Sequence, residues 1–162
     1  MKKTLLIFLA SLMYLLGAHA GADGYEVSLT RKASNVYRVD GKDIIIQTRY
    51  CYVYAYSEEA FFRTRGYGGE VIFFDSKQKC DVKGIFAAAE QTPGKYVVTL
   101  SQEDDDWYEV FGTNMYIQTA SCLSRALGEE AYLTIHSSGF GTLRFADGND
   151  CMVEGVYTKL RL

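Results

Sequence analysis

Four cysteines are the residues whose type and position most directly indicate chemistry. They are Cys51, Cys80, Cys122 and Cys151 in a chain of 162 residues. An even number of cysteines in an exported chain indicates disulfides, and four cysteines allow three pairings. The alternative is a metal site, but the spacing is too long for a Cys-x-x-Cys motif and no histidine lies beside any of the four. The cysteines are therefore expected to be structural.

Candidate catalytic residues are few. His19 lies in an expected leader, so His136 would be the only histidine of the mature chain. On paper, Ser137 or Ser138 could join His136 and Asp147 in a Ser-His-Asp set. Adjacent residues on a strand or turn rarely reach nucleophile–base geometry, and no Gly-x-Ser-x-Gly elbow is present. We expect no enzymatic activity by this route and no cofactor.

Two pairs of adjacent carboxylates, Glu58-Glu59 and Glu129-Glu130, could in principle act as glycosidase carboxylates. The two pairs stand 71 residues apart at equivalent places in the chain, each at an expected hairpin tip. A turn is therefore the favoured interpretation. The prediction is a non-enzymatic protein.

The longest charged run could bind a cation or a basic partner. It consists of Glu103, Asp104, Asp105 and Asp106. A solvated loop is the simplest interpretation, and an electrostatic surface that steers a basic protein is the sharper one. Calcium is a third option, but the run lacks the spaced Asp-x-Asp-x-Asp-Gly pattern. We expect no metal site.

Residues 1–20 have the organisation of a secretory signal peptide. Lys2 and Lys3 precede an apolar run over 5–16, and Ala18-His19-Ala20 fits a small-x-small cleavage site. A membrane anchor is the alternative, but the apolar run is shorter than the roughly 20 residues that a spanning helix needs. The protein is therefore expected in the periplasm or outside the cell, without a membrane span after cleavage. Its acidic excess argues against nucleic-acid binding.

An internal repeat organises the rest of the chain. Shifted by 71 residues, 25–86 align with 96–157 without a gap, and 19 of the 62 pairs are identical. The identical pairs include all four cysteines, so duplication favours Cys51–Cys80 and Cys122–Cys151, one bridge per copy. We interpret 21–91 and 96–162 as repeats joined by a connector at 92–95, with the only proline at 93.

Each repeat has the pattern of strands. Apolar residues alternate with polar ones at 25–29 and 96–100, and Asp40-Gly41 indicates a hairpin between 36–39 and 44–46. A second hairpin is expected over 50–63, although a helix is the rival interpretation there. The prediction is an all-β protein of ten to fourteen strands. Two disulfide-stapled units of about 62 residues would pack with pseudo-two-fold symmetry, as a sandwich or barrel-like structure.

Positions where the repeats differ are the candidate binding residues. Residues 25–86 carry ten basic and eight acidic residues, whereas 96–157 carry two basic and ten acidic ones. In the expected strand at 50–56, Tyr50, Tyr52, Tyr54 and Tyr56 would lie on one face, opposite Cys51, Val53 and Ala55. Such a tyrosine row is a candidate protein interface, or it packs inside the molecule. The glycine loops at 65–69 and 136–141 are turns or elements that enter a cleft, which adds His136, Ser137 and Ser138 to the candidates.

These patterns together predict an exported binding protein of the inhibitor or immunity type. It would occlude a basic partner, such as a cell-wall hydrolase or a toxin. A carbohydrate- or surface-binding module, with the tyrosines stacked on sugar rings, is one alternative. A structural subunit of the cell envelope is another.

Overall fold

The computed structural model describes residues 24–65 and 68–161, and these residues form strands and connections without a helix. The expected signal peptide, and part of the first glycine loop, lie outside the described residues. The first half contains β1 (Gly24–Ala33), β2 (Val36–Val39), β3 (Ile44–Arg49), β4 (Glu58–Arg65), β5 (Gly68–Phe73) and β6 (Lys79–Ala88). The second half contains β7 (Gly94–Asp104), β8 (Trp107–Val110), β9 (Met115–Ala120), β10 (Leu127–Ile135), β11 (Gly141–Phe145) and β12 (Asp150–Lys159).

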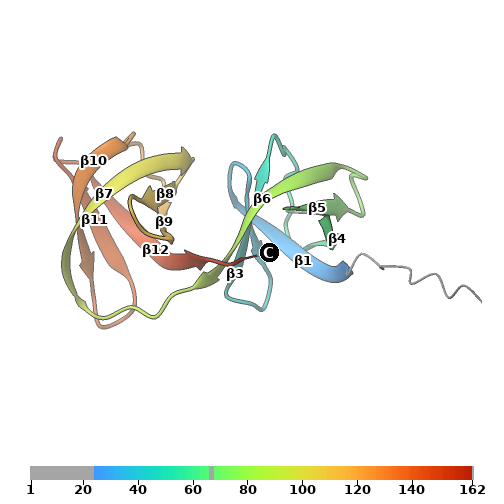
Figure 1. Cartoon of the computed structure of the whole chain (residues 1–162), viewed down its shortest axis with the longest axis horizontal. Coiled ribbons are helices and arrows are strands. Elements are labelled where there is room, and N and C mark those ends of the chain that lie inside the picture. Colours follow the sequence, from blue (N-terminus) through green and yellow to red (C-terminus); the bar gives the residue numbers. More distant parts are fainter. Residues whose placement is uncertain (1–23, 66–67, 162) are drawn as a thin grey trace, which may run out of the picture.

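Each half closes into a six-stranded antiparallel barrel. The first follows the order β1-β2-β3-β6-β5-β4 and returns to β1. The second repeats this order as β7-β8-β9-β12-β11-β10. The two barrels stand side by side as separate lobes in Figure 1. Within the described residues, closure pairs the strands of each half with one another and leaves an edge only at the ends of β6 and β12. The all-β prediction is confirmed, and its strand number agrees.

Each barrel has its own apolar core, and the disulfide of that barrel is part of the core. Cys51–Cys80 lies among buried residues of the first barrel and Cys122–Cys151 among those of the second, as the repeat predicts. In the first core the buried Tyr37 packs against Phe73 of β5. In the second core the buried Tyr108 packs in the same way against Phe145 of β11. Two disulfides are compatible with an oxidising, exported environment.

The barrels join through their last strands, β6 and β12. Residues 86–88 pair with 157–159 in antiparallel register, and Ala87 lies opposite Thr158. Ala87 and Thr158 are equivalent positions in the 71-residue repeat, so the pairing is centred on a local two-fold axis. A third apolar cluster fills the junction, in which Trp107 stacks with Tyr116 and meets Phe86 edge to face. The arrangement matches the predicted pseudo-two-fold packing, whereas duplication as its origin stays an interpretation.

The gapless alignment is wrong at one strand. Val71 of β5 pairs with Cys80, and Leu143 of β11 pairs with Cys151, so Val71 and Leu143 are equivalent with a shift of 72 residues. Phe145 therefore corresponds to the buried Phe73 and not to Phe74. The loop before β11 is one residue longer than its counterpart and the loop after it is one residue shorter. The two changes in loop length cancel, so a gapless alignment of the two repeats does not reveal them.

Candidate binding surface

The predicted tyrosine row is exposed to solvent. Tyr50, Tyr52, Tyr54 and Tyr56 are 84%, 70%, 84% and 87% exposed, while Cys51, Val53 and Ala55 are buried. The predicted alternation of the two faces is therefore confirmed. The expected hairpin over 50–63 is wrong, because residues 51–55 run extended without strand pairing and β4 begins only at Glu58. We call residues 50–57 the tyrosine segment.

Backbone geometry explains why β3 does not continue into the tyrosine segment. Tyr50 and Ser57, at its two ends, adopt positive φ angles of 52° and 49°. This left-handed conformation is uncommon for residues other than glycine, and it turns the chain out of a strand. The tyrosine segment therefore belongs to neither β3 nor β4. It crosses the first barrel as an extended, unpaired stretch, which we also call the strap of the first barrel.

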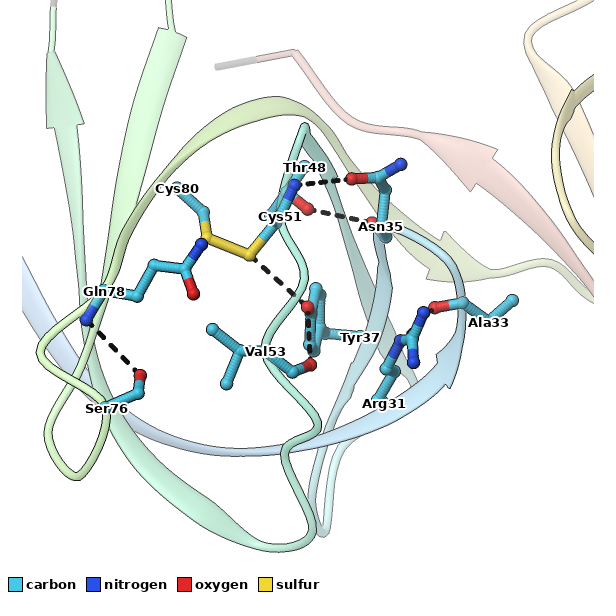
Figure 2. Close-up of a disulfide and its surroundings, with 10 residues drawn as sticks. All are labelled: Arg31, Ala33, Asn35, Tyr37, Thr48, Cys51, Val53, Ser76, Gln78 and Cys80. Carbon is cyan, nitrogen blue, oxygen red and sulfur yellow. Dashed lines mark hydrogen bonds between the residues drawn. A yellow bond between two sulfur atoms is a disulfide. The ribbon is translucent and has the colours of Figure 1, made fainter.

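Side chains of the first barrel hold the strap in place. The Cys51 amide donates a hydrogen bond to Asn35 Oδ1 at 2.8 Å, and the Tyr37 hydroxyl donates one to the Val53 carbonyl at 2.9 Å. Figure 2 shows these contacts beside the Cys51–Cys80 bridge. Burial raises the pKa of Tyr37 to about 12, so its hydroxyl keeps the proton that it donates.

The C-terminal half of the strap is hydrogen-bonded to β1. The Arg31 amide donates to the Ala55 carbonyl at 2.9 Å, and the Ser57 amide donates to Thr30 Oγ1 at 3.0 Å. The Arg31 guanidinium also lies over the Tyr54 ring, 4.3 Å from its centroid. A cation over an aromatic face restrains the ring. The exposed rings therefore extend from a backbone that is fixed at several points.

The acidic run has a structural role that the sequence did not indicate. Asp104 accepts hydrogen bonds from Asn35 Nδ2 at 3.0 Å and from Gln47 Nε2 at 2.5 Å, and Glu103 forms an ion pair with Lys83. These contacts join the two barrels across the junction. Glu103 and Asp104 thus form the end of strand β7 and contact the first barrel, instead of forming a free loop.

The rest of the run divides between two tasks. Asp106 Oδ1 accepts hydrogen bonds from the Cys122 amide at 2.6 Å and from Thr119 Oγ1 at 3.0 Å, so this carboxylate supports its own barrel. Asp105 is exposed and accepts a hydrogen bond from Ser34 at 2.7 Å. Of the four predicted carboxylates, Asp105 is the one that remains most available to a partner.

Asp105 and the tyrosine segment border the same hollow. A depression of about 480 Å³ is lined by Tyr54, Tyr56 and Asp105. Arg31 and Lys32 also line it, but Arg31 lies over Tyr54 and Lys32 pairs with Glu154. The structure thus brings together two features that the sequence predicted separately.

The tyrosine segment also lies beside carboxylates that the sequence did not predict as part of a binding surface. Glu58, Glu59 and Asp75 share a second hollow, of about 400 Å³, with Tyr54 and Tyr56. Glu58 and Glu59 lie on β4, opposite Leu29 and Ser28 of β1, so the expected hairpin tip is wrong for this pair. The available signal was their position directly after the tyrosine row. Their repeat equivalents, Glu129 and Glu130, likewise lie on β10.

The glycine loop of the second barrel lies apart from this surface. The His136 amide donates to the Phe140 carbonyl at 2.8 Å, and the Gly139 amide donates back to the His136 carbonyl at 3.0 Å. These bonds close a tight turn in which Ser137 and Ser138 are exposed. The His136 side chain shares a depression with Lys95 and Arg144. None of these three loop residues lines either hollow beside the tyrosines.

Residues 121–128, the repeat equivalent of the tyrosine segment, form the strap of the second barrel and provide a comparison within the same chain. Cys122, Ser124 and Ala126 are buried, and the Tyr108 hydroxyl donates to the Ser124 carbonyl at 2.6 Å, as Tyr37 does to Val53. Its exposed face carries Leu123 and Leu127 at 94% and 90% exposure. Both straps share one anchoring scheme, but only the first presents a row of aromatic rings.

No protein-family model, no curated protein and no solved structure gives a significant match to this chain. In the part of the chain that the structure describes, no helix is long and apolar enough to cross a membrane. Within the same described ranges, no three histidine, cysteine or acidic side chains come together as a metal ion would require.

Proposed function

We propose that this protein is an exported, non-enzymatic binding protein that blocks a basic protein, such as a cell-wall hydrolase or a toxin, in the periplasm or outside the cell. The observation that carries the proposal is the row of four exposed tyrosines on a strap that a disulfide and hydrogen bonds hold in place. Tyrosine offers large contact area with few rotatable bonds, so a pre-positioned row loses little entropy when it binds.

The charges beside the tyrosine segment support a basic partner. Glu58, Glu59 and Asp75 share one hollow with Tyr54 and Tyr56, and Asp105 shares another with the same two rings. Opposite charges at the rim of an interface raise the association rate and fix the orientation of the partner. The partner would meet aromatic rings at the centre and carboxylates at the edge, and its active cleft would be closed by occlusion.

A panel of basic muramidases, amidases and cell-wall-directed toxins tests the proposal. Each enzyme is assayed on purified cell wall with the mature protein and with a Tyr52→Ser/Tyr54→Ser variant. We expect stoichiometric inhibition of at least one enzyme, which weakens with added salt and falls at least tenfold in the variant. Leu123→Ser, at the equivalent exposed position of the second strap, is the matched control and should inhibit normally.

Glycan arrays and sedimentation distinguish the alternatives. Tyrosine-dependent glycan binding without inhibition of any enzyme would replace the proposal with a carbohydrate-binding module. Self-association in sedimentation, again without inhibition, would favour a structural subunit of the envelope. Inhibition that is equal in the wild type and in the tyrosine variant would place the binding surface elsewhere.

A further inference from the structure

The mouth of the second barrel contains an apolar cavity that is separate from the tyrosine segment. Its volume is about 510 Å³, within the range of roughly 300–1,000 Å³ that is usual for small-molecule sites. The buried side chains of Ile117, Leu133 and Val156 lie at its base. Tyr96 and Phe111, on neighbouring segments, line it nearer the solvent. An apolar ligand could therefore leave water without displacing any core residue.

The walls of the cavity are held in position. The Tyr96 hydroxyl donates a hydrogen bond to the Thr92 carbonyl at 2.7 Å. The Tyr96 ring also covers Gly94 so closely that a Cβ atom there would lie 3.2 Å from a ring carbon. On the other side, the Phe111 amide donates to the Thr99 carbonyl at 2.8 Å. A preformed cavity with fixed walls saves the ordering cost that a flexible site would add to binding.

The first barrel carries different side chains at the positions that are equivalent to those lining the cavity. The equivalent of Leu133 is Phe62, whose larger ring is buried and stacks with Tyr25 at 6.4 Å between centroids. The equivalent of Phe111 is Asp40, which accepts a hydrogen bond from Ser28 at 2.9 Å. Glu26 stands where the second barrel has Val97. A bulkier base and a charged rim thus distinguish the first barrel, so an apolar mouth is a property of the second barrel's own residues.

We propose that this cavity binds an amphiphile with one aliphatic chain and an uncharged, hydroxyl-bearing head, the chemistry of a monoacylglycerol. The aliphatic side chains at the base of the cavity suit the aliphatic chain of the ligand. The rim offers threonine hydroxyls and the Glu90 carboxylate, which can exchange hydrogen bonds with hydroxyls of the head. The same carboxylate lies in the connector before β7, and residues 96–157 carry ten acidic and two basic residues, which disfavours an anionic head. This inference is independent of the partner proposed for the tyrosine segment.

Calorimetry and methyl NMR on the mature chain test the inference, with monooctanoylglycerol as the probe and octanoate as its anionic counterpart. We expect saturable one-to-one binding of monooctanoylglycerol, with shifts of the Ile117 and Leu133 methyl signals, and at least fivefold weaker binding of octanoate. Leu133→Phe, which installs the residue of the first barrel, should weaken binding at least tenfold. Leu123→Phe adds the same volume on the outer surface and should bind normally.

A second variant keeps the test decisive if Leu133→Phe does not fold. Val97 is 61% exposed, so Val97→Glu changes the rim without changing the core, and it should also weaken binding at least tenfold. Met152→Glu, at a similarly exposed position outside the cavity, is its control. No saturable binding up to the solubility limit of the probe, unchanged affinity in both cavity variants, or preference for octanoate would overturn the inference.

Discussion

Removal of one disulfide at a time separates the stability of the barrels from the order of the tyrosine segment. Each bridge joins cysteines 29 residues apart. A closed loop of this length constrains the unfolded chain by about 3.6 kcal/mol on the chain-entropy estimate. We therefore expect Cys51→Ala/Cys80→Ala and Cys122→Ala/Cys151→Ala to lower the free energy of unfolding by similar amounts, about 3–4 kcal/mol each. Urea denaturation followed by circular dichroism measures both values.

The two variants should differ in the local order of the first strap. Cys51 is the buried residue that links the tyrosine segment to β6, so its loss leaves the segment attached only by hydrogen bonds such as that from Tyr37 to Val53. Amide hydrogen exchange over 50–57 should accelerate in Cys51→Ala/Cys80→Ala and stay unchanged in Cys122→Ala/Cys151→Ala. Equal exchange in both variants, or stability losses that differ by more than about 2 kcal/mol, would refute this account of the strap.

Three further predictions concern the junction and the cores. Asp104→Ala leaves the buried amide of Gln47 without its acceptor and should cost about 1–3 kcal/mol of unfolding free energy, whereas Asp75→Ala on the surface should cost almost nothing. Trp107→Ala empties the cluster between the barrels and should cost about 3–5 kcal/mol in a denaturant titration, against almost none for Leu123→Ala. Burial raises the pKa of three tyrosines to about 12, above the usual value of about 10 that applies in the unfolded chain, so their contribution to stability is complete below pH 10 and is lost as the pH rises through 12. Thermal melts should show this alkaline loss, about 2 kcal/mol per residue at pH 12, and a constant melting temperature over this range would contradict the role of Tyr37, Tyr108 and Tyr116.

The disulfides and the exposed tyrosines could be predicted because they depend on local pattern and repetition. Identical cysteine positions in both halves favoured one bridge per half. Strict alternation around Cys51 and Val53 placed the tyrosines on the opposite face, whether or not the segment pairs as a strand. These predictions needed no knowledge of which strands are neighbours.

The closure of each half into its own barrel could not be predicted from local pattern and repetition. Closure depends on the pairing of β1 with β4 and of β5 with β6, and neither pairing has a signal in the local sequence. The positive φ angle of Tyr50, which ends β3 and turns 51–55 into an unpaired strap, was hidden for the same reason. Tyrosine is a strong strand former, so local propensity pointed to a hairpin.

The role of the acidic run was also a matter of long-range contacts. Asp104 meets Asn35 and Gln47, which lie 69 and 57 residues away in the sequence. A row of carboxylates looks like a solvated loop until these partners are known. Conversely, the place of Glu58, Glu59 and Asp75 beside the tyrosine segment depends on the fold, and their position in the sequence does not predict it.

The pairing of β6 with β12 about Ala87 and Thr158 has a consequence for each barrel taken alone. Because equivalent residues face each other across this axis, the edge that a barrel offers to its neighbour is complementary to a copy of itself. A fragment that ends after β6 would expose that edge together with the apolar side chains of Val36, Ile45 and Phe86. Such a fragment is suited to homodimerise, and the tandem arrangement satisfies the same edge within a single chain.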